Sequence, residues 1–162
     1  PAPKGFDQTQ LMLMGGVARS LQIAGALESM LDISVRYSNE RVAFEKKISK
    51  FQAVQHNLAR LAGESAAALA AATSAADAYA NATSFNDELF LRCSEAAEKG
   101  GGIAHQVHGA IGFTIEHILH RYSLRALAWR DDFGSESYWA VELGKLVCDR
   151  GADELWPLVA SR

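Results

Sequence analysis

Apolar side chains recur every three or four residues along the first forty residues of the chain. This spacing places them on one side of an α-helix, which turns once in about 3.6 residues. Asp7 is a suitable N-cap because its carboxylate can accept a hydrogen bond from the first helical turn. The pattern therefore predicts a helix that begins at Asp7 and ends near Asn39. Its expected apolar stripe consists of Leu11, Met14, Ala18, Leu21, Ile23, Leu27, Leu31 and Val35.

A charged, irregular stretch at 40–49 interrupts this pattern, and a second helical pattern begins near Ser49. It continues into an alanine-rich run at 66–82. Alanine has the highest helix propensity and lets neighbouring helices approach closely. The run therefore predicts a tightly packed helix rather than disorder. The chain breaks again at 81–86, where Ser84 is the candidate N-cap of the next helix.

The third predicted helix, which ends at His108, contains the consecutive glycines Gly100, Gly101 and Gly102. Three glycines cost about 2 to 3 kcal/mol of helix propensity relative to alanine. We therefore expect either a kink or the close approach of another element at this point.

The remaining pattern predicts two more helices and a tail. The turn 109–112 separates the third helix from a fourth, which runs from about Glu116 to Asp131. Ser135 or Glu136 then opens a fifth, shorter helix. The tail carries Trp156, which we expect to dock on the other helices.

The expected fold is all-α: an antiparallel up-down bundle of four principal long helices plus a shorter one, in a single domain over 1–162. No proline occurs between Phe6 and Trp156, which permits long helices. No stretch shows a convincing alternation of apolar and polar residues of the kind that predicts strands.

Composition and charge narrow the possible functions. The formal net charge is −3, and basic residues are interspersed with acidic ones, so neither nucleic acid nor a membrane surface is an expected partner. No apolar run approaches the roughly 20 residues of a membrane span. Cys93 and Cys148 lie far apart and do not indicate a disulfide framework. The absence of a signal-peptide pattern agrees with a reducing compartment, either the bacterial cytoplasm or the mitochondrial matrix.

The segment HQVHGAIGF, at 105–113, could be a metal site, a nucleotide-binding turn, or simply the end of one helix and the start of the next. The pairs His105/His108 and His117/His120 have helical spacing that suits a metal site. Metal sites in helical bundles, however, use Glu-x-x-His motifs from facing helices, which this chain lacks. Polar contacts, caps or interface roles are the expected alternative. The glycines do not form the GxGxxG fingerprint of a Rossmann fold, and no GxSxG motif marks a nucleophile.

Two segments resemble the acyl-CoA dehydrogenase family. The stretch from Tyr37 to Gln52 is similar to the family pattern Y-x-x-x-R-x-x-F-G-x-x-I-x-x-x-Q, and 106–113 is similar to Q-x-x-G-G-x-G. The beginning, at 5–9, resembles the opening of the family's C-terminal helical domain. The similarity covers nearly all of this chain, and implies that the family's N-terminal helical and β domains are absent from it.

The resemblance implies a flavin chemistry. Members of the family bind FAD and oxidise acyl-CoA thioesters to 2-enoyl-CoA, in fatty acid or steroid side-chain β-oxidation. A carboxylate removes the α proton, a hydride passes to the flavin, and the electrons then pass to an electron-transfer flavoprotein. The C-terminal domain also builds the dimer or tetramer, and its motif residues contact the FAD of a neighbouring subunit. An acyl-CoA, an electron-transfer flavoprotein and a homo- or hetero-oligomeric partner are therefore the expected partners.

The resemblance also assigns cofactor contacts. Arg41 would meet the FAD pyrophosphate, for which a guanidinium offers a planar fork of donors. Phe44 would pack beside the cofactor and Gln52 would hydrogen-bond near it. Gln106 and the backbone of Gly109 and Ala110 would hold the ADP portion of FAD. Ser135 stands in for the threonine that touches FAD.

The chain departs from the family pattern at the catalytic base. The usual glutamate position is Phe133, and the alternative position near the start of the first helix is Thr9, followed by Gln10 in place of an arginine. Neither Phe133 nor Thr9 carries a carboxylate, so no catalytic residue is assigned. Glu45 also replaces the usual glycine after Phe44.

These departures lead to one hypothesis and two alternatives. We expect an oligomerisation and FAD-contacting domain that is inactive alone and does not retain FAD, in a subunit whose partner supplies the carboxylate. An active dehydrogenase with a relocated base such as Asp132 is the first alternative. A purely structural helical oligomerisation module is the second.

Overall fold

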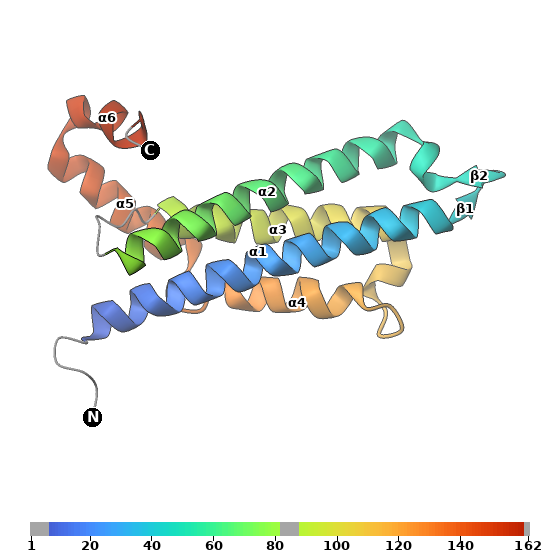
Figure 1. Ribbon diagram of the computed structural model, residues 1–162, viewed down its shortest axis with the longest axis horizontal. Coiled ribbons are helices and arrows are strands. Elements are labelled where there is room, and N and C mark those ends of the chain that lie inside the picture. The colour runs from blue at the N-terminus through green and yellow to red at the C-terminus, as the bar shows by residue number, and fades with distance from the viewer. Residues whose placement is uncertain (1–6, 82–87, 161–162) are drawn as a thin grey trace.

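A computed structural model describes residues 7–81 and 88–160, and they form a bundle of antiparallel helices (Figure 1). The helices of the bundle are α1 (Gln8–Glu40), α2 (Gln52–Ala80), α3 (Glu88–His108) and α4 (Leu119–Trp129). Helices α5 (Glu136–Arg150) and α6 (Leu155–Ala160) follow, and α6 lies beyond the end of the bundle (Figure 1). Short 3₁₀ turns connect these elements: η1 (Ile48–Lys50), η2 (Gly109–Phe113) and η3 (Ala152–Glu154). The predicted all-α class and up-down bundle are confirmed.

Two predicted helix starts have the expected local chemistry. The Asp7 carboxylate accepts a hydrogen bond from the amide of Gln10 at 2.9 Å, which caps α1. The Ser135 hydroxyl accepts one from the amide of Tyr138 at 3.3 Å, which caps α5. The third predicted cap, Ser84, lies outside the described residues.

The interruption after α1 contains a β-hairpin that the sequence pattern did not predict. Strands β1 (Val42–Ala43) and β2 (Lys46–Lys47) pair antiparallel. Phe44 and Glu45 form the two-residue turn with φ angles of 52° and 63°, the left-handed conformation that such turns require. Strands of two residues are too short for an alternating pattern to appear. The hairpin and η1 also delay the start of α2 to Gln52, three residues after the predicted position.

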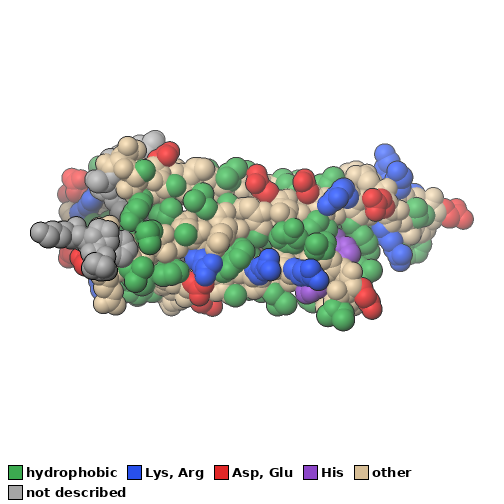
Figure 2. Space-filling model, turned by 60° about the horizontal axis from the view of Figure 1, so that its bottom comes forward, with side chains coloured by type: hydrophobic (Ala, Val, Ile, Leu, Met, Phe, Trp, Pro, Cys, Tyr) green, Lys and Arg blue, Asp and Glu red, His purple; other side chains and the backbone are tan. Residues whose placement is uncertain are grey.

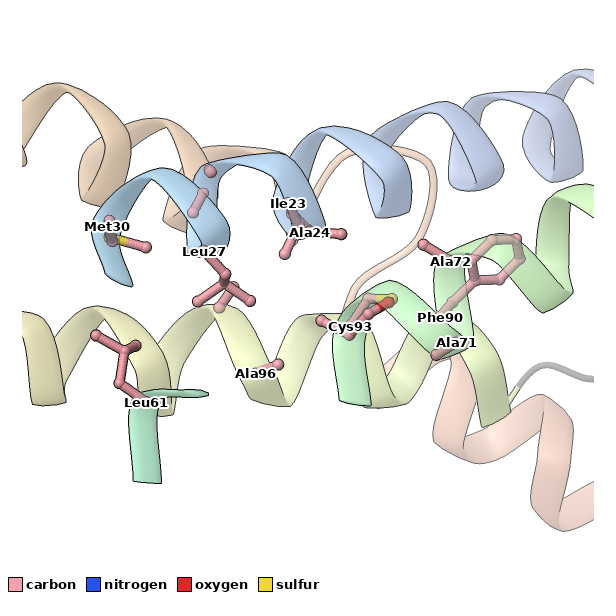
Figure 3. Packing of buried hydrophobic residues seen from close by; sticks show 14 of the residues in the cluster. Ile23, Ala24, Leu27, Met30, Leu61, Ala71, Ala72, Phe90, Cys93 and Ala96 are labelled. Atoms are coloured by element: carbon pink, nitrogen blue, oxygen red, sulfur yellow. The ribbon is translucent and has the colours of Figure 1, made fainter. Parts of the chain in front are cut away.

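The core is built from a few large aliphatic side chains among many small ones (Figure 3). Leu27 and Met30 of α1 face Leu61 of α2, and all three are fully buried. Alanines fill much of the remaining interface between α2 and α3, and the fully buried ones are Ala68, Ala72, Ala75, Ala96 and Ala97. Because alanine side chains are short, these two helices pack closely over much of their length, as the alanine run predicted.

Only one of the three consecutive glycines is required by helix packing. A Cβ atom on Gly100 would lie 2.3 Å from Leu27 Cδ2 and 3.3 Å from Leu61 Cδ1. A Cβ on Gly101 or Gly102 would meet nothing within 4 Å. The expected close approach is therefore confirmed at Gly100, while a Cβ atom on either of the other two glycines would point into open space.

The apolar stripe predicted for α1 is not the face that the bundle buries. Ile23 and Leu27 are buried, but Leu11, Met14 and Leu21 are exposed by 41% to 44%. The buried face instead includes small and polar residues, which are Gly15, Gly16, Ser20, Ser34 and Ser38. Because α1 packs against α2, α3 and α4, close approach to three helices selects small residues there and leaves larger apolar ones outside.

The fourth helix and the tail also differ from the predictions. Residues 114–118 form a turn rather than the first part of a helix, so α4 begins at Leu119. Trp156 is 75% exposed and does not dock, whereas Trp139 of α5 is 5% exposed and its ring centroid lies 4.5 Å from that of Phe90. In the described part of the chain, no helix combines the length and apolar character that crossing a bilayer requires.

Candidate functional site

A cavity of about 730 Å³ lies along α3, η2 and α4. Small and polar residues of α3 and η2 form one side, and residues one helical turn apart on α4 form the other. The lining residues are Glu98, Gly101, Gly102, His105, Gln106, Gly109, Ala110, Phe113, His120, Ser123, Leu124, Leu127 and Arg130. Its size and its mixture of apolar and polar groups are typical of a small-molecule site.

Glycine backbone forms part of the cavity wall. A Cβ atom on Gly101, Gly102 or Gly109 would have no neighbour within 4 Å. Gly109 also has a φ of 68°, which terminates α3 in a conformation that glycine adopts without steric cost. A ligand can therefore approach the main chain closely at this wall, including the turn where α3 ends.

The polar groups of the cavity come from facing helices. His105 Nε2 and Ser123 Oγ share a hydrogen bond of 2.8 Å, and the His105 ring stacks on Phe113 at 4.1 Å between centroids. At the opposite end, Arg130 pairs with Glu98 at 2.8 Å. Side-chain contacts therefore bridge α3 to η2 and to α4 and its C-cap at both ends of the cavity.

Tyr37 connects the end of α1 to the end of α3. Its hydroxyl donates a hydrogen bond to the carbonyl of His108 at 3.3 Å, and the two rings stack at 4.5 Å. The hairpin that follows α1 and the turn η2 that follows α3 therefore lie at the same end of the bundle (Figure 1). Figure 2 shows histidine side chains reaching the surface toward this end.

The structure gathers part of the predicted cofactor set. Gln106, Gly109 and Ala110 line the cavity together. Arg41, Phe44 and Gln52 do not line it; they belong to the hairpin and the start of α2. Phe44 is 89% exposed at the hairpin tip, and the other two side chains are also exposed.

Ser135 lies in a neighbouring cavity of about 340 Å³ at the start of α5. The two cavities share Glu98 and Arg130. Arg130 also pairs with Glu136 at 2.8 Å and so ties α4 to the first turn of α5. The predicted residues thus occupy three separate places on one chain rather than a single pocket.

The turn 132–135, where the resemblance places the base, is fixed from two sides. Phe133 has a left-handed φ of 56°, and its ring lies over α1, where a Cβ on Gly15 would be 2.2 Å from Phe133 Cδ1. Asp132 pairs with Arg19 of α1 at 2.8 Å. The turn therefore directs an aromatic ring into the bundle and engages its neighbouring carboxylate in an ion pair.

Thr9, the alternative base position, lines a third cavity of about 520 Å³ between α1 and α5. Met12 lies in the same wall, and Glu142 contributes a carboxylate. That carboxylate accepts a hydrogen bond from the Lys145 ammonium at 2.7 Å.

Burial sets the electrostatics of the first cavity. It lowers the pKa of His105 below the usual 6.5, and the nearby His120 lowers that pKa further. The pKa of His108 is also lowered, chiefly by burial, although a hydrogen bond to Ala104 opposes the shift. Both imidazoles are therefore neutral at pH 7. No group of three or more His, Cys, Asp or Glu side chains among the described residues is arranged to hold a metal ion.

Sequence reasoning missed the α4 wall of the cavity. His120, Leu124 and Leu127 repeat at helical spacing, but this signal looks the same as that of an ordinary buried stripe. Ser123 carries no sequence signal for a contact with His105. Only the packing of α4 against α3 shows that these side chains share a cavity.

Fold and cavity together define an all-α domain with a ligand-sized groove where its third helix ends. Residues 4–136 match the family model described as "Acyl-CoA dehydrogenase, C-terminal domain". The chain therefore belongs to the acyl-CoA dehydrogenase family.

Individual relatives agree with this assignment. The acyl-CoA dehydrogenase IpdE2 of Mycobacterium tuberculosis is 36% identical over 102 residues, which are 63% of this chain and 31% of that protein. A chain from the structure of the electron transferring flavoprotein of Acidaminococcus fermentans superposes with a TM-score of 0.80 at 25% identity, over 85% of this chain and 37% of that one. The Tcur3481–Tcur3483 steroid ACAD variant superposes with a TM-score of 0.74 at 28% identity, over 88% of this chain and 41% of that one. The chain spans about a third of the length of the curated relative.

Proposed function

We propose that this chain is the FAD-contacting and assembly-forming C-terminal domain of a flavoprotein that oxidises acyl-CoA thioesters to 2-enoyl-CoA. The observation that carries the proposal is the cavity at the end of α3, because Gln106, Gly109 and Ala110 line it together. These are the residues that the family resemblance assigns to the ADP portion of FAD. When bound, the flavin supplies the acceptor for hydride.

The residues of the cavity suit an adenine nucleotide. The exposed backbone at Gly102 and Gly109 lets a flat ring or a phosphate approach the main chain. The Gln106 amide offers both a donor and an acceptor to a ribose or base. Arg41, on the exposed hairpin at the same end of the bundle, is available for a pyrophosphate.

The proposed site is shared between subunits. Three residues of the predicted cofactor set lie in separate places on this chain: Arg41, Gln106 and Ser135. This separation is expected if each residue contacts a different part of a long FAD molecule, or if they contact two different FAD molecules in the assembly. The exposed apolar residues on α1, which include Leu11, Met14 and Leu21, provide a surface for assembly. The relative Tcur3481–Tcur3483 is named for two different proteins, and the partner in our proposal is likewise a second, different subunit.

That partner supplies the carboxylate base. Phe133 has no proton acceptor and its ring packs over Gly15. Asp132, the candidate for a relocated base, is held by Arg19 at 2.8 Å. Thr9 is a neutral hydroxyl in a cavity that Met12 and Leu13 make partly apolar. The chain alone is therefore expected to be inactive, and in the complete assembly its electrons pass to an electron-transfer flavoprotein.

The first experiment tests the nucleotide site with ADP as the probe. Addition of ADP to the ¹⁵N-labelled chain should shift the amide resonances of 106–110, and Gln106→Ala should weaken ADP binding about fivefold to tenfold through the loss of a hydrogen bond. Gln10→Ala, an exposed glutamine at the start of α1, is the matched control and should leave binding unchanged. The absence of shifts at 106–110 would refute the site.

A second experiment separates the shared site from a self-sufficient enzyme. The purified chain should lack stoichiometric flavin absorbance, because the cavity contacts only one end of FAD. In the full-length parent with its partner, Asp132→Asn should leave acyl-CoA-dependent dye reduction largely intact. A large loss of turnover would instead establish Asp132 as the base.

A further inference from the structure

Four of the five histidines of the chain surround the turn η2. His105 and His108 lie on the last turn of α3, and His117 and His120 lie beside the start of α4. The ring centroids of His108 and His117 are 4.7 Å apart. His56, the fifth histidine, is exposed on α2 and belongs to a different part of the bundle.

His108 is held in one neutral tautomer. Its Nδ1–H donates a hydrogen bond to the carbonyl of Ala104 at 2.8 Å, so a neutral ring has its lone pair on Nε2. That Nε2 atom is buried and has no hydrogen-bond partner among the described residues. The ring is stacked on Tyr37 at 4.5 Å, and only 5% of the residue is exposed. A proton on Nε2 would create a buried charged donor with no acceptor, which is strongly unfavourable.

The His105 ring also has one nitrogen that would become a buried donor without an acceptor on protonation. Its Nε2 is engaged with Ser123 Oγ at 2.8 Å, and its Nδ1 is buried without a partner among the described residues. Nδ1 faces η2, because a Cβ on Gly112 would lie 3.1 Å from it and 3.0 Å from His108 Cβ. The His105 ring and the Cβ atom of His108 therefore both lie beside Gly112, and the His105 ring also stacks on Phe113 of η2.

The charged groups around the pair carry both signs. Glu98, which lines the same cavity as His105, is paired with Arg130 at 2.8 Å. Tyr37 is the α1 residue stacked on His108, while Arg36 and Glu40 of α1 lie with His117 around a separate small cavity. From α4, His120 lies near His105, and the neighbouring Arg121 is exposed. Burial and the neighbouring imidazoles accordingly lower the pKa values of both His105 and His108.

We propose that these histidines form an acid-sensitive latch, in which neutral His105 and His108 hold η2 against the end of α3 and their protonation releases it. Movement of the 109–113 turn would hydrate the charged rings and satisfy Nδ1 of His105 and Nε2 of His108, because Gly112 lies beside both side chains and Phe113 covers the His105 ring. The proposal concerns the chain's own structure and does not need a bound nucleotide. If the proposed function also holds, the release displaces Gly109 and Ala110 and would weaken the nucleotide site in acid.

The test follows imidazole and amide signals of the ligand-free chain between pH 7.5 and pH 5. His105 and His108 should titrate below pH 6.5, the usual pKa of an imidazole. Hydrogen exchange at 109–113, corrected for its intrinsic pH dependence, should become less protected at pH 5, by up to about 30-fold for each ring, because an exposed imidazole with a pKa of about 6.5 is then about thirty times more often protonated than neutral. Protection of α2 amides at 61–75 should remain higher than that of 109–113 at both pH values, which distinguishes local release from global unfolding.

Variants link the release to the two rings. His105→Gln/His108→Gln removes both titrating groups and should make the protection of 109–113 the same at pH 7.5 and pH 5. His56→Gln should retain the wild-type pH dependence. If the double variant does not fold, the wild-type titration still decides, because release must share its midpoint with the titration of His105 and His108.

Two outcomes would overturn the latch. One is titration of both histidines near pH 6.5 with unchanged protection at 109–113. The other is pH-dependent release that persists in the folded double variant. Because neither measurement includes FAD or ADP, failure of the latch is distinguishable from failure of the proposed function, which the ADP shifts at neutral pH report.

Discussion

Contacts of individual side chains determine how closely α1, α2 and α3 pack. Gly100 is the clearest example, because two buried leucines, Leu27 and Leu61, occupy the space into which a side chain would point. Gly102, two residues later on the same helix, faces open space. The same residue type therefore has opposite consequences at the two positions.

We predict that Gly100→Ala destabilises the chain by about 1 to 2 kcal/mol, since overpacking of a filled core outweighs the gain in helix propensity. Gly102→Ala should instead stabilise it by up to about 1 kcal/mol. Urea denaturation of both variants measures the two effects. Equal effects of the same sign would show that propensity alone governs this segment.

At the scale of single residues, sequence reasoning succeeds where the cause is local. Asp7 caps the first helix as predicted, and Ser135, one of the two predicted starts of the fifth helix, caps that helix, because an N-cap depends on amides only two or three residues away. Sequence reasoning does not distinguish Gly100 from Gly102, because the tight packing at Gly100 comes from Leu27 and Leu61, which are remote in sequence.

Among the helices after the bundle, α5 is anchored and α6 is not. Trp139 of α5 is 5% exposed and contacts the Phe90 ring of α3, with Gly134 close to its indole. Trp156 of α6 is 75% exposed. Burial of aromatic area is the main means by which a short helix is held against a bundle.

Trp139→Ala should therefore cost about 3 to 5 kcal/mol of stability, the usual range for loss of a buried tryptophan. Trp156→Ala should change stability by less than about 0.5 kcal/mol. Thermal unfolding followed by far-UV circular dichroism provides the comparison. A large effect of Trp156→Ala would restore the original expectation that the tail docks.

The predicted order of helices holds at the scale of elements, but their boundaries and faces are less well predicted. The hairpin at 42–47 escaped detection because its strands have only two residues each. On α1, apolar periodicity selected residues that include the exposed Leu11, Met14 and Leu21. A helix that packs on three neighbours has no single apolar stripe, and periodicity alone cannot tell an interior face from one available for assembly.

At the scale of the whole molecule, the neutral imidazoles of His105 and His108 make the free energy of unfolding depend on pH. Their pKa values are lowered in the folded chain, so the unfolded chain binds more protons below about pH 6.5. Their contribution to stability is complete above pH 6.5 and is lost as the pH falls. We predict a decrease of about 1 kcal/mol in the free energy of unfolding between pH 7.5 and pH 5.5.

Urea denaturation at the two pH values measures this decrease. His108→Gln should reduce the pH dependence, whereas His56→Gln, at an exposed position, should preserve it. A free energy of unfolding that rises toward pH 5.5 would contradict the neutral state of the buried rings.

By itself, the sequence determined the helical class, the order of the helices, two of their caps and the family motifs. Each of these depends on neighbours within a few turns of the chain or on a pattern of residue types. Only the tertiary structure decided that Gln106, Gly109 and Ala110 share a cavity with Ser123 of α4, that Phe133 lies over Gly15, and that Asp132 is held by Arg19. The physical reason is that these contacts join segments remote in sequence, and close packing fixes such contacts only when the helices come together.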